Sequence, residues 1–435
     1  MKLLSTNSCR VANNLGAITT IDHLRETDPE AAGFRPGQIE KIWAATEGLY
    51  RTGFSPAITL CVRRQGKIVL NRAIGHARGN GPEDSADTSK QLATPDTPVC
   101  LFSASKVVTA MLIHLLDEQG HIDLLDPVSH YIPEYGVNGK RNATIYHLLA
   151  HRGGIPKISS NFDPEMLYDT PAVMRELYKA EPVSPSGYRA AYHAITAGYI
   201  LGELIERVTG KTVRQFLDES FRQPLGMRYF DYGMRPEDRD AVAVNYCTGF
   251  KPVPPVSTYI QHVLGGSLEL ATDMTNDPRF MDTVCPAGNL YATAEEASRF
   301  FQMLLDGGEY EGRRIFNPMT IRRATLEVSR PEFDGTLLMP MRYSMGMMLG
   351  NKPVGLYGPF TQRAFGHLGF TSIFCWADPD RDTSVSLLTS GKALVGPHLP
   401  ALGKLLLTLS RECPVSRQPR PAVLSDNRHA PAFPI

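Results

Sequence analysis

Residues 103–120, SASKVVTAMLIHLLDEQG, contain the sequence pattern that is most informative about the fold. Apolar residues recur three and four positions apart from Val108 to Leu116, which is the spacing of the buried face of an α-helix. Gly120 stands where a glycine commonly follows the end of a helix. We therefore predict a largely buried helix with Ser103 at its start.

Ser103 and Lys106 stand three residues apart, which places both side chains on one face of this helix. A serine hydroxyl attacks a carbonyl carbon only with the help of a base, and a lysine acts as that base only if burial or nearby cations lower its pKa. The following Val107 and Val108 favour such burial, and free N–H groups at a helix start can stabilise an oxyanion. The alternative is that Ser103 only caps the helix and Lys106 is solvated.

Tyr192 is the second candidate, in SGYRAAYHAITAGYILGELIERVTGK (186–211), where a glycine-containing loop leads into an apolar helix. A phenol at that junction can pass a proton between the attacking hydroxyl, the lysine and the leaving group. Two alternatives remain open: the Tyr192 ring only packs, or the neighbouring Tyr188 takes this role.

The third candidate is the stretch GHLGF (366–370), which opens a strand-like run. A glycine there permits a close approach of substrate to a sheet edge, and the Phe370 amide can join that of Ser103 in an oxyanion hole. His367 either contacts substrate or is a structural hydrogen-bonding residue. We therefore expect Ser103, His367, Gly369 and Phe370 to bind the substrate or its oxyanion.

The flanking segments predict the fold class, which is α/β (α+β). Residues 56–77 are typical of a β-hairpin turning at Gln65-Gly66, residues 79–98 of a loop, and short strands return after Pro340. Helices are expected at 144–150, 171–180, 194–209, 212–221, 293–306 and 398–411. We expect an α/β lobe from 20–100 and 285–412, a mainly helical lobe from 101–284, pocket walls from 155–190 and 245–284, and a Pro-rich tail at 413–435 that is mobile or extended.

The composition limits the classes of molecule that we expect this protein to bind. Acidic and basic residues balance at 45 each in 435 residues, which argues against nucleic acid and favours a small neutral substrate. The seven cysteines form no C-x-x-C pair, so we expect neither a metal site nor a disulfide framework. The N-terminus turns polar after Leu4, and no stretch approaches the roughly 20 apolar residues of a membrane span. We expect a cytoplasmic protein without membrane contact, in an oligomeric state that the sequence leaves open.

In this order, the three candidates resemble the S-x-x-K, Y-x-N and K-T-G motifs of the serine β-lactamase and penicillin-binding-protein superfamily. Within it, Tyr192-His193-Ala194 is similar to the second motif of the family VIII carboxylesterases, which are class C β-lactamase-like. The resemblance implies a β-lactamase-like fold, an antiparallel sheet flanked by helices with a mainly helical second lobe. It also implies Ser103 as acyl-forming nucleophile, Lys106 and Tyr192 as base and proton relay, and no cofactor.

Two departures from the superfamily pattern shape the expected substrate. Ala194 replaces the Asn that binds a substrate amide, and His367 replaces the Lys of K-T-G. A site without these groups pairs poorly with penicillins or peptidoglycan peptides, which favours small-molecule esters, with weak β-lactamase activity still open. The leading hypothesis is thus a serine carboxylesterase. The alternatives are an acyltransferase (transesterase), a β-lactamase or D-Ala-D-Ala peptidase-like enzyme, and a non-catalytic member that retains the fold.

Overall fold

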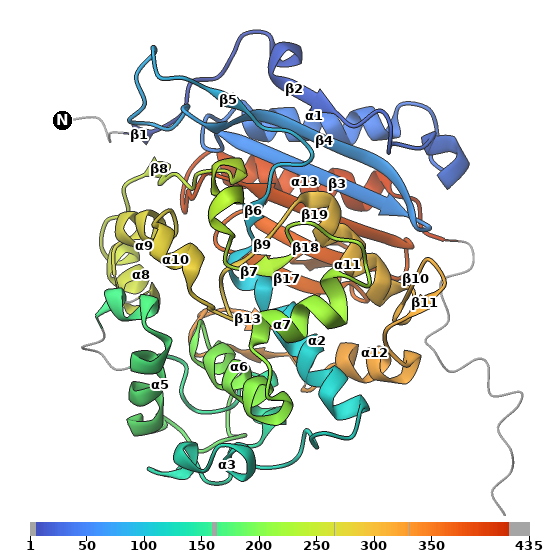
Figure 1. Ribbon diagram of the computed structural model, residues 1–435. Coiled ribbons are helices and arrows are strands. Elements are labelled where there is room, and N and C mark those ends of the chain that lie inside the picture. The colour runs from blue at the N-terminus through green and yellow to red at the C-terminus, as the bar shows by residue number, and fades with distance from the viewer. Residues whose placement is uncertain (1–5, 159–162, 265, 330, 417–435) are drawn as a thin grey trace, which may run out of the picture.

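The computed structural model describes residues 6–158, 163–264, 266–329 and 331–416. Its centre is an eight-stranded antiparallel sheet (Figure 1) in which strands from the two ends of the chain lie side by side. Neighbouring strands, in order, are β14 (Met348–Leu349), β17 (Phe365–Gly369), β18 (Ile373–Asp378), β19 (Thr383–Thr389), β3 (Ala57–Arg64), β4 (Lys67–Arg78) and β2 (Thr19–Ile21), with β5 (Gln91–Leu92) also on β4.

The predicted hairpin is confirmed, because β3 and β4 pair on either side of Gln65 and Gly66. These two turn residues have φ of +53° and +76°, and a two-residue turn of this kind requires positive φ at both positions. The C-terminal strand β19 then pairs with β3 from Thr383 opposite Arg64 to Thr389 opposite Ile58. Two strands that are more than 300 positions apart in the chain therefore pair at the centre of the sheet.

Alternate residues of β3 point into two separate apolar cores. Ile58, Leu60 and Val62 belong to the core beneath α1 (Gln38–Tyr50) and α13 (His398–Glu412). Ala57 and Cys61 belong to the other core, which contains α11 (Ala294–Leu305) and the central helix α2 (Ser105–Glu118). This period of two is expected of a strand that is buried on both faces.

The expected helices form, with small shifts at their ends. They are α2, α4 (Ile145–Leu149), α5 (Thr170–Lys179), α6 (Thr196–Thr209), α7 (Val213–Leu217), which continues as a π-helical turn at Asp218–Arg222, α11 and α13. Gly120 follows the end of α2 with φ of +74°, as predicted. Elements that we did not anticipate are α1, α3 (Val128–Tyr131), α8 (Val256–Leu264), α9 (Leu268–Met274), α10 (Pro278–Asp282) and α12 (Pro318–Thr325).

A small antiparallel sheet lies beside the start of α2 and is built from β6 (Val99–Cys100), β9 (Leu290–Ala292) and β7 (Asp231–Tyr232), in that order. β6 leads directly into a 3-10 turn, Phe102–Ala104, that precedes α2. The Leu290 amide donates to Ser105 Oγ at 3.0 Å. This sheet therefore fixes the loop before β9 against the Ser103 turn. The remaining strands pair as β1 (Thr6–Asn7) with β8 (Gly249–Phe250), β10 (Glu309–Tyr310) with β11 (Arg313–Arg314), β12 (Glu332–Phe333) with β13 (Pro340–Met341), and β15 (Val354–Gly355) with β16 (Gly358–Pro359).

The α/β class, with an antiparallel sheet flanked by helices, is confirmed. The division into a lobe of 20–100 and 285–412 and a lobe of 101–284 is not tested and remains a prediction. Most of the predicted tail, 417–435, lies outside the described residues. Among the helices of the described part of the chain, none is long and apolar enough to cross a membrane.

Candidate active site

Ser103 lies in the 3-10 turn between β6 and α2 and is partly exposed. The preceding Phe102 has φ of +48°, a left-handed conformation that bulky residues rarely adopt. Such local strain persists only where the surrounding structure holds it, and here it turns the chain sharply just before the serine. The sharp turn leaves Ser103 accessible at the start of an otherwise buried helix.

Lys106 meets Ser103 as its spacing predicts. Its Nζ lies 3.1 Å from Ser103 Oγ and donates to the Ala287 carbonyl oxygen at 2.9 Å. Only 8% of the residue is exposed, and burial lowers its pKa from 10.5 to about 7, with the Cys285 thiol opposing the shift. An amine with this pKa is partly neutral at physiological pH, so it can accept the Ser103 proton.

Tyr192 lies beside Lys106, with its ring centroid 5.1 Å from the Lys106 Nζ. Burial raises the pKa of Tyr192 well above its usual value, while a hydrogen bond with the Ser103 side chain opposes that shift. The phenol therefore keeps its proton at neutral pH and is suited to donate it. Tyr188 is 76% exposed and lines neither pocket at Ser103, so the structure does not favour it in this role.

The GHLGF stretch forms β17 and the turn after it. A Cβ at Gly369 would lie 2.4 Å from the Leu101 carbonyl oxygen, so the absence of a side chain allows the segment before Ser103 to pack closely against β17. Gly369 also lines a pocket at Ser103. The Phe370 ring packs against that of Phe102, with centroids 5.4 Å apart. These contacts bring the segment containing Phe370 beside the turn that contains Ser103, as the proposed pair of oxyanion amides requires.

His367 is buried and faces the Tyr192 ring, with centroids 5.9 Å apart. Its Nδ1 donates to the Leu368 carbonyl oxygen at 2.6 Å, so Nε2 carries the lone pair, and Nε2 has no hydrogen-bond partner among the described residues. Burial, and next the charge of Lys106, lower the pKa of His367 to about 3. The imidazole is therefore uncharged at neutral pH.

Two neighbours of Tyr192 complete the site, although sequence reasoning did not single them out. Fully buried Asp334 accepts hydrogen bonds from the Tyr192 amide at 3.1 Å and the Tyr343 hydroxyl at 3.0 Å. The His151 ring packs against the Tyr192 ring at a tilt of 56°, with centroids 4.8 Å apart. Asp334 stands before Gly335, which signals only a turn, and a lone histidine carries no signal of its own.

Two apolar pockets open at Ser103. The first, of about 160 Å³, is lined by Phe102, Ser103, Pro164, Leu167, Ala194, Ile195, Gly266, Leu270, Ala271, Met274, Thr275, Phe280, Cys285, Ala287, Gly288 and Phe370. The second, of about 300 Å³, is lined by Ser103, Tyr192, Ala194, Tyr259, Ile260, Leu337, Met339, Met341, Met348, Leu356, Leu368, Gly369, Phe370, Thr371 and Leu394. Segments 155–190 and 245–284 thus contribute walls, as predicted.

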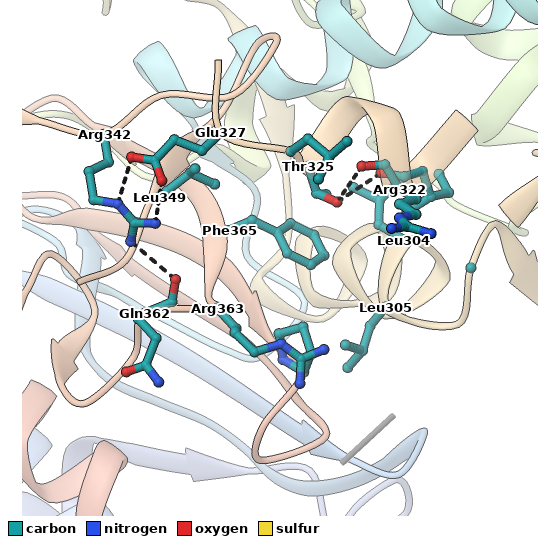
Figure 2. A pocket seen from close by; sticks show the side chains of 14 residues that line it. Leu304, Leu305, Arg322, Thr325, Glu327, Arg342, Leu349, Gln362, Arg363 and Phe365 are labelled. Atoms are coloured by element: carbon teal, nitrogen blue, oxygen red, sulfur yellow. Dashed lines mark hydrogen bonds and ion pairs between the residues drawn. The ribbon is translucent and has the colours of Figure 1, made fainter. Parts of the chain in front are cut away.

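A separate cavity of about 300 Å³ lies between α11, α12 and β17 (Figure 2) and contains none of the candidate residues. Two of the three arginines in its lining are engaged by carboxylates: Arg342 pairs with Glu327 at 2.8 Å, and Arg363 with Asp380 at 2.9 Å.

A β-lactamase-like fold with a buried lysine beside the serine that precedes its central helix defines the class, which is the serine β-lactamase and penicillin-binding-protein superfamily. The chain belongs to the Beta-lactamase family, whose family model matches residues 44–407. The resemblance stated from the motifs is thereby confirmed.

The relatives differ in the activities that their names describe. Esterase/beta-lactamase LipL of Mycobacterium tuberculosis is 28% identical over 306 residues, covering 67% of this chain and 69% of the relative. N-acetylmuramyl-L-alanine amidase of Bacillus subtilis is 24% identical over 399 residues, covering 86% and 84%. A solved family VIII carboxylesterase shares the fold with a TM-score of 0.73 at 24% identity, covering 87% of this chain and 98% of its own.

Proposed function

We propose that this protein is a serine carboxylesterase that hydrolyses small neutral esters through an acyl-enzyme at Ser103. The observation that carries the proposal is the 3.1 Å approach of the Lys106 Nζ to Ser103 Oγ, made by an amine whose burial lowers its pKa to about 7. A base poised near neutral pH within hydrogen-bonding reach of a hydroxyl is what activation of a serine requires.

The proposed reaction has two halves. Neutral Lys106 takes the Ser103 proton as Oγ bonds to the ester carbonyl carbon, and the carbonyl electron pair moves onto the oxygen, where the Ser103 and Phe370 amides stabilise it. When the intermediate collapses, the bond to the alcohol oxygen breaks, Tyr192 gives its proton to that oxygen, and the Lys106 proton replaces it. Water then attacks the acyl-enzyme by the same transfers, releasing the acid and restoring Ser103.

His367 favours esters over β-lactams and peptides. It stands at the position where the superfamily has a lysine, yet burial keeps its ring uncharged and its Nε2 has no proton to donate. A substrate carboxylate placed there would find no cation, and Ala194 offers no side-chain donor for an amide. Penicillins and peptidoglycan peptides should therefore react poorly.

An acyltransferase is the second candidate. It needs an alcohol to replace water at the acyl-enzyme, and the apolar 300 Å³ pocket beside Tyr192 is suited to retain one. Product analysis of an ester incubated with a series of alcohols separates the two activities, because a transesterase forms the new ester in water.

The test combines mass and kinetics. The wild-type protein should form a covalent adduct with a fluorophosphonate and show a burst of phenol release from an aryl ester, whereas Ser103→Ala should show neither. Ser105→Ala is the matched control: Ser105 is buried and accepts a hydrogen bond from the Leu290 amide, so the control should remain labelled at Ser103. Full esterase activity in Ser103→Ala would exclude the proposal.

A further inference from the structure

The two pockets at Ser103 share a short wall and diverge from it. Ser103, Ala194 and Phe370 line both. The pocket of about 160 Å³, called here the α9 pocket, extends beneath Leu270, Ala271 and Met274 of α9. The pocket of about 300 Å³, called here the methionine pocket, is surrounded by Met339, Met341 and Met348. A molecule bound at Ser103 can therefore extend in two directions.

Neither pocket has an aspartate, glutamate, lysine or arginine in its lining, among the residues that the structure describes. Apolar side chains dominate both, and the polar side chains are Ser103 with Thr275 and Cys285 in the α9 pocket and with Tyr192, Tyr259 and Thr371 in the methionine pocket. A charged substituent in either pocket would lose its hydration without gaining a partner, which is costly. Uncharged apolar groups suit both pockets.

Tyr192 makes the two pockets chemically different. It lines the methionine pocket and does not line the α9 pocket. Three groups surround the carbon that Ser103 attacks: the oxyanion, the acyl chain and the alcohol oxygen. Only the alcohol oxygen needs a proton as its bond breaks, so this oxygen must lie on the side of the Tyr192 hydroxyl. The acyl chain is then directed the other way.

From this asymmetry we propose that the substrate is an uncharged ester with apolar groups on both sides, its acyl chain in the α9 pocket and its alcohol in the methionine pocket. This inference rests on the proposed esterase function and adds a direction to it. Because the α9 pocket has about half the volume, the limit on chain length is stricter for the acid than for the alcohol. Methionine side chains adapt to varied shapes, so the alcohol side tolerates more structures.

Two ester series test the direction: alkanoates of increasing length on one alcohol, and acetates of alcohols of increasing length. In each series kcat/KM should rise about fourfold per methylene until the pocket is full, and the acyl series should reach its limit first. Adding a carboxylate to the end of either chain should lower kcat/KM at least tenfold, because the carboxylate would lose its hydration in the pocket without gaining a partner.

Two pocket-filling variants act as matched controls for each other. Ala271 lines only the α9 pocket and Leu394 only the methionine pocket. Ala271→Phe should shorten the limit of the acyl series and leave the preference among alcohols in place, whereas Leu394→Trp should do the reverse. Exchange of these effects between the variants, or the same effect on both series, would overturn the assignment.

The two halves of the reaction give an independent readout. The alcohol has left before water attacks, so Leu394→Trp should change only the acylation rate. Ala271→Phe should change both acylation and hydrolysis of the same acyl-enzyme, measured by stopped flow and intact mass. If Leu394→Trp changed the rate of acyl-enzyme hydrolysis and Ala271→Phe did not, the assignment of the acyl chain to the α9 pocket would be contradicted. Failure of the esterase proposal itself looks different, because no Ser103 adduct would then form in any variant.

Discussion

In the proposed reaction, the protonation state of Lys106 decides whether Ser103 can be activated. Burial lowers its pKa to about 7, and only the neutral amine can take the serine proton. We therefore predict that kcat/KM for an uncharged ester rises with pH through about 7 and then levels off. Lys106→Arg should remove activity at every pH, because a guanidinium keeps its proton. A rate that falls as pH rises through 7 would contradict this role.

Lys392 is a second buried lysine with a different role. Its Nζ donates to the Thr389 carbonyl oxygen at 2.7 Å and lies 4.6 Å from the centre of the Phe102 ring. Burial lowers its pKa from 10.5 to about 7, so between about pH 7 and 10 the unfolded chain binds this proton and the folded chain does not. Its contribution to the free energy of unfolding therefore rises with pH across that window.

Replacing the Lys392 amine by an apolar group tests whether burial of this amine destabilises the folded chain. Lys392→Met should raise the free energy of unfolding at pH 7 and flatten its rise toward pH 10, as measured by urea unfolding at several pH values. The pH profile of catalysis should still follow Lys106. If Lys392→Met is less stable at every pH, its contacts with Thr389 and Phe102 outweigh the cost of burial.

The loop between β12 and β13 is the element that positions Tyr192. The Ala190 amide donates to Glu332 at 2.6 Å, the Gly335 amide to the Ala190 carbonyl oxygen at 3.1 Å, and the Tyr192 amide to Asp334 at 3.1 Å. These three hydrogen bonds hold two residues of an otherwise irregular segment, Ala190 and Tyr192, against residues 332–335. The phenol thereby gains a fixed place without a helix or strand of its own.

Loss of this attachment should appear as poorer protonation of the leaving group. Asp334→Ala is predicted to lower kcat/KM roughly 10²-fold for alkyl esters, whose alkoxides need a proton, and much less for nitrophenyl esters. Asp334→Asn can still accept the amide hydrogen bonds and should retain more of the activity. Equal losses on both kinds of ester in Asp334→Ala would indicate general damage to the fold instead.

Elements were predictable where their signal is local. The helix at Ser103 and the Lys106 pairing follow from a spacing of three residues, and the hairpin from Gln65-Gly66. Asp334 was not predictable, because it reaches Tyr192 across 142 positions through a backbone amide. Local patterns contain no information on which distant segment a loop contacts.

At the scale of the molecule, buried contacts join segments that are distant in the chain. Glu295 on α11 pairs with Arg63 on β3 and, at 2.6 Å, with Arg299 on its own helix. Glu295 and Arg63 are almost fully buried, so removing Glu295 would leave the Arg63 guanidinium without its carboxylate, which typically costs about 3–5 kcal/mol. If Arg63 were removed, Glu295 would still pair with Arg299. The N-terminal hairpin is therefore fastened to the helix that follows the active-site segments.

Buried histidines, among them His114, His151, His193 and His367, make the stability of the molecule sensitive to acid. Burial lowers the pKa of His114 and His193 to about 4 and that of His367 to about 3, and it places that of His151 well below its usual value. Below about pH 6.5 the unfolded chain binds protons that the folded chain does not. Each histidine should then lower the free energy of unfolding by up to about 1.4 kcal/mol per pH unit.

We predict a steep loss of stability as pH falls from about 6.5 to about 4, measurable by urea unfolding at half-unit intervals. His114 contacts the Met345 carbonyl oxygen and lines none of the Ser103 pockets, so His114→Phe should reduce the slope without altering the direction of the catalytic pH profile. His121→Asn, at an exposed position, should leave the slope unchanged. His114 Nδ1 has no hydrogen-bond partner among the described residues, so a proton added there in the folded chain would be buried and unpaired. An unaltered slope in His114→Phe would contradict this expectation and show that the ring takes up its proton without unfolding.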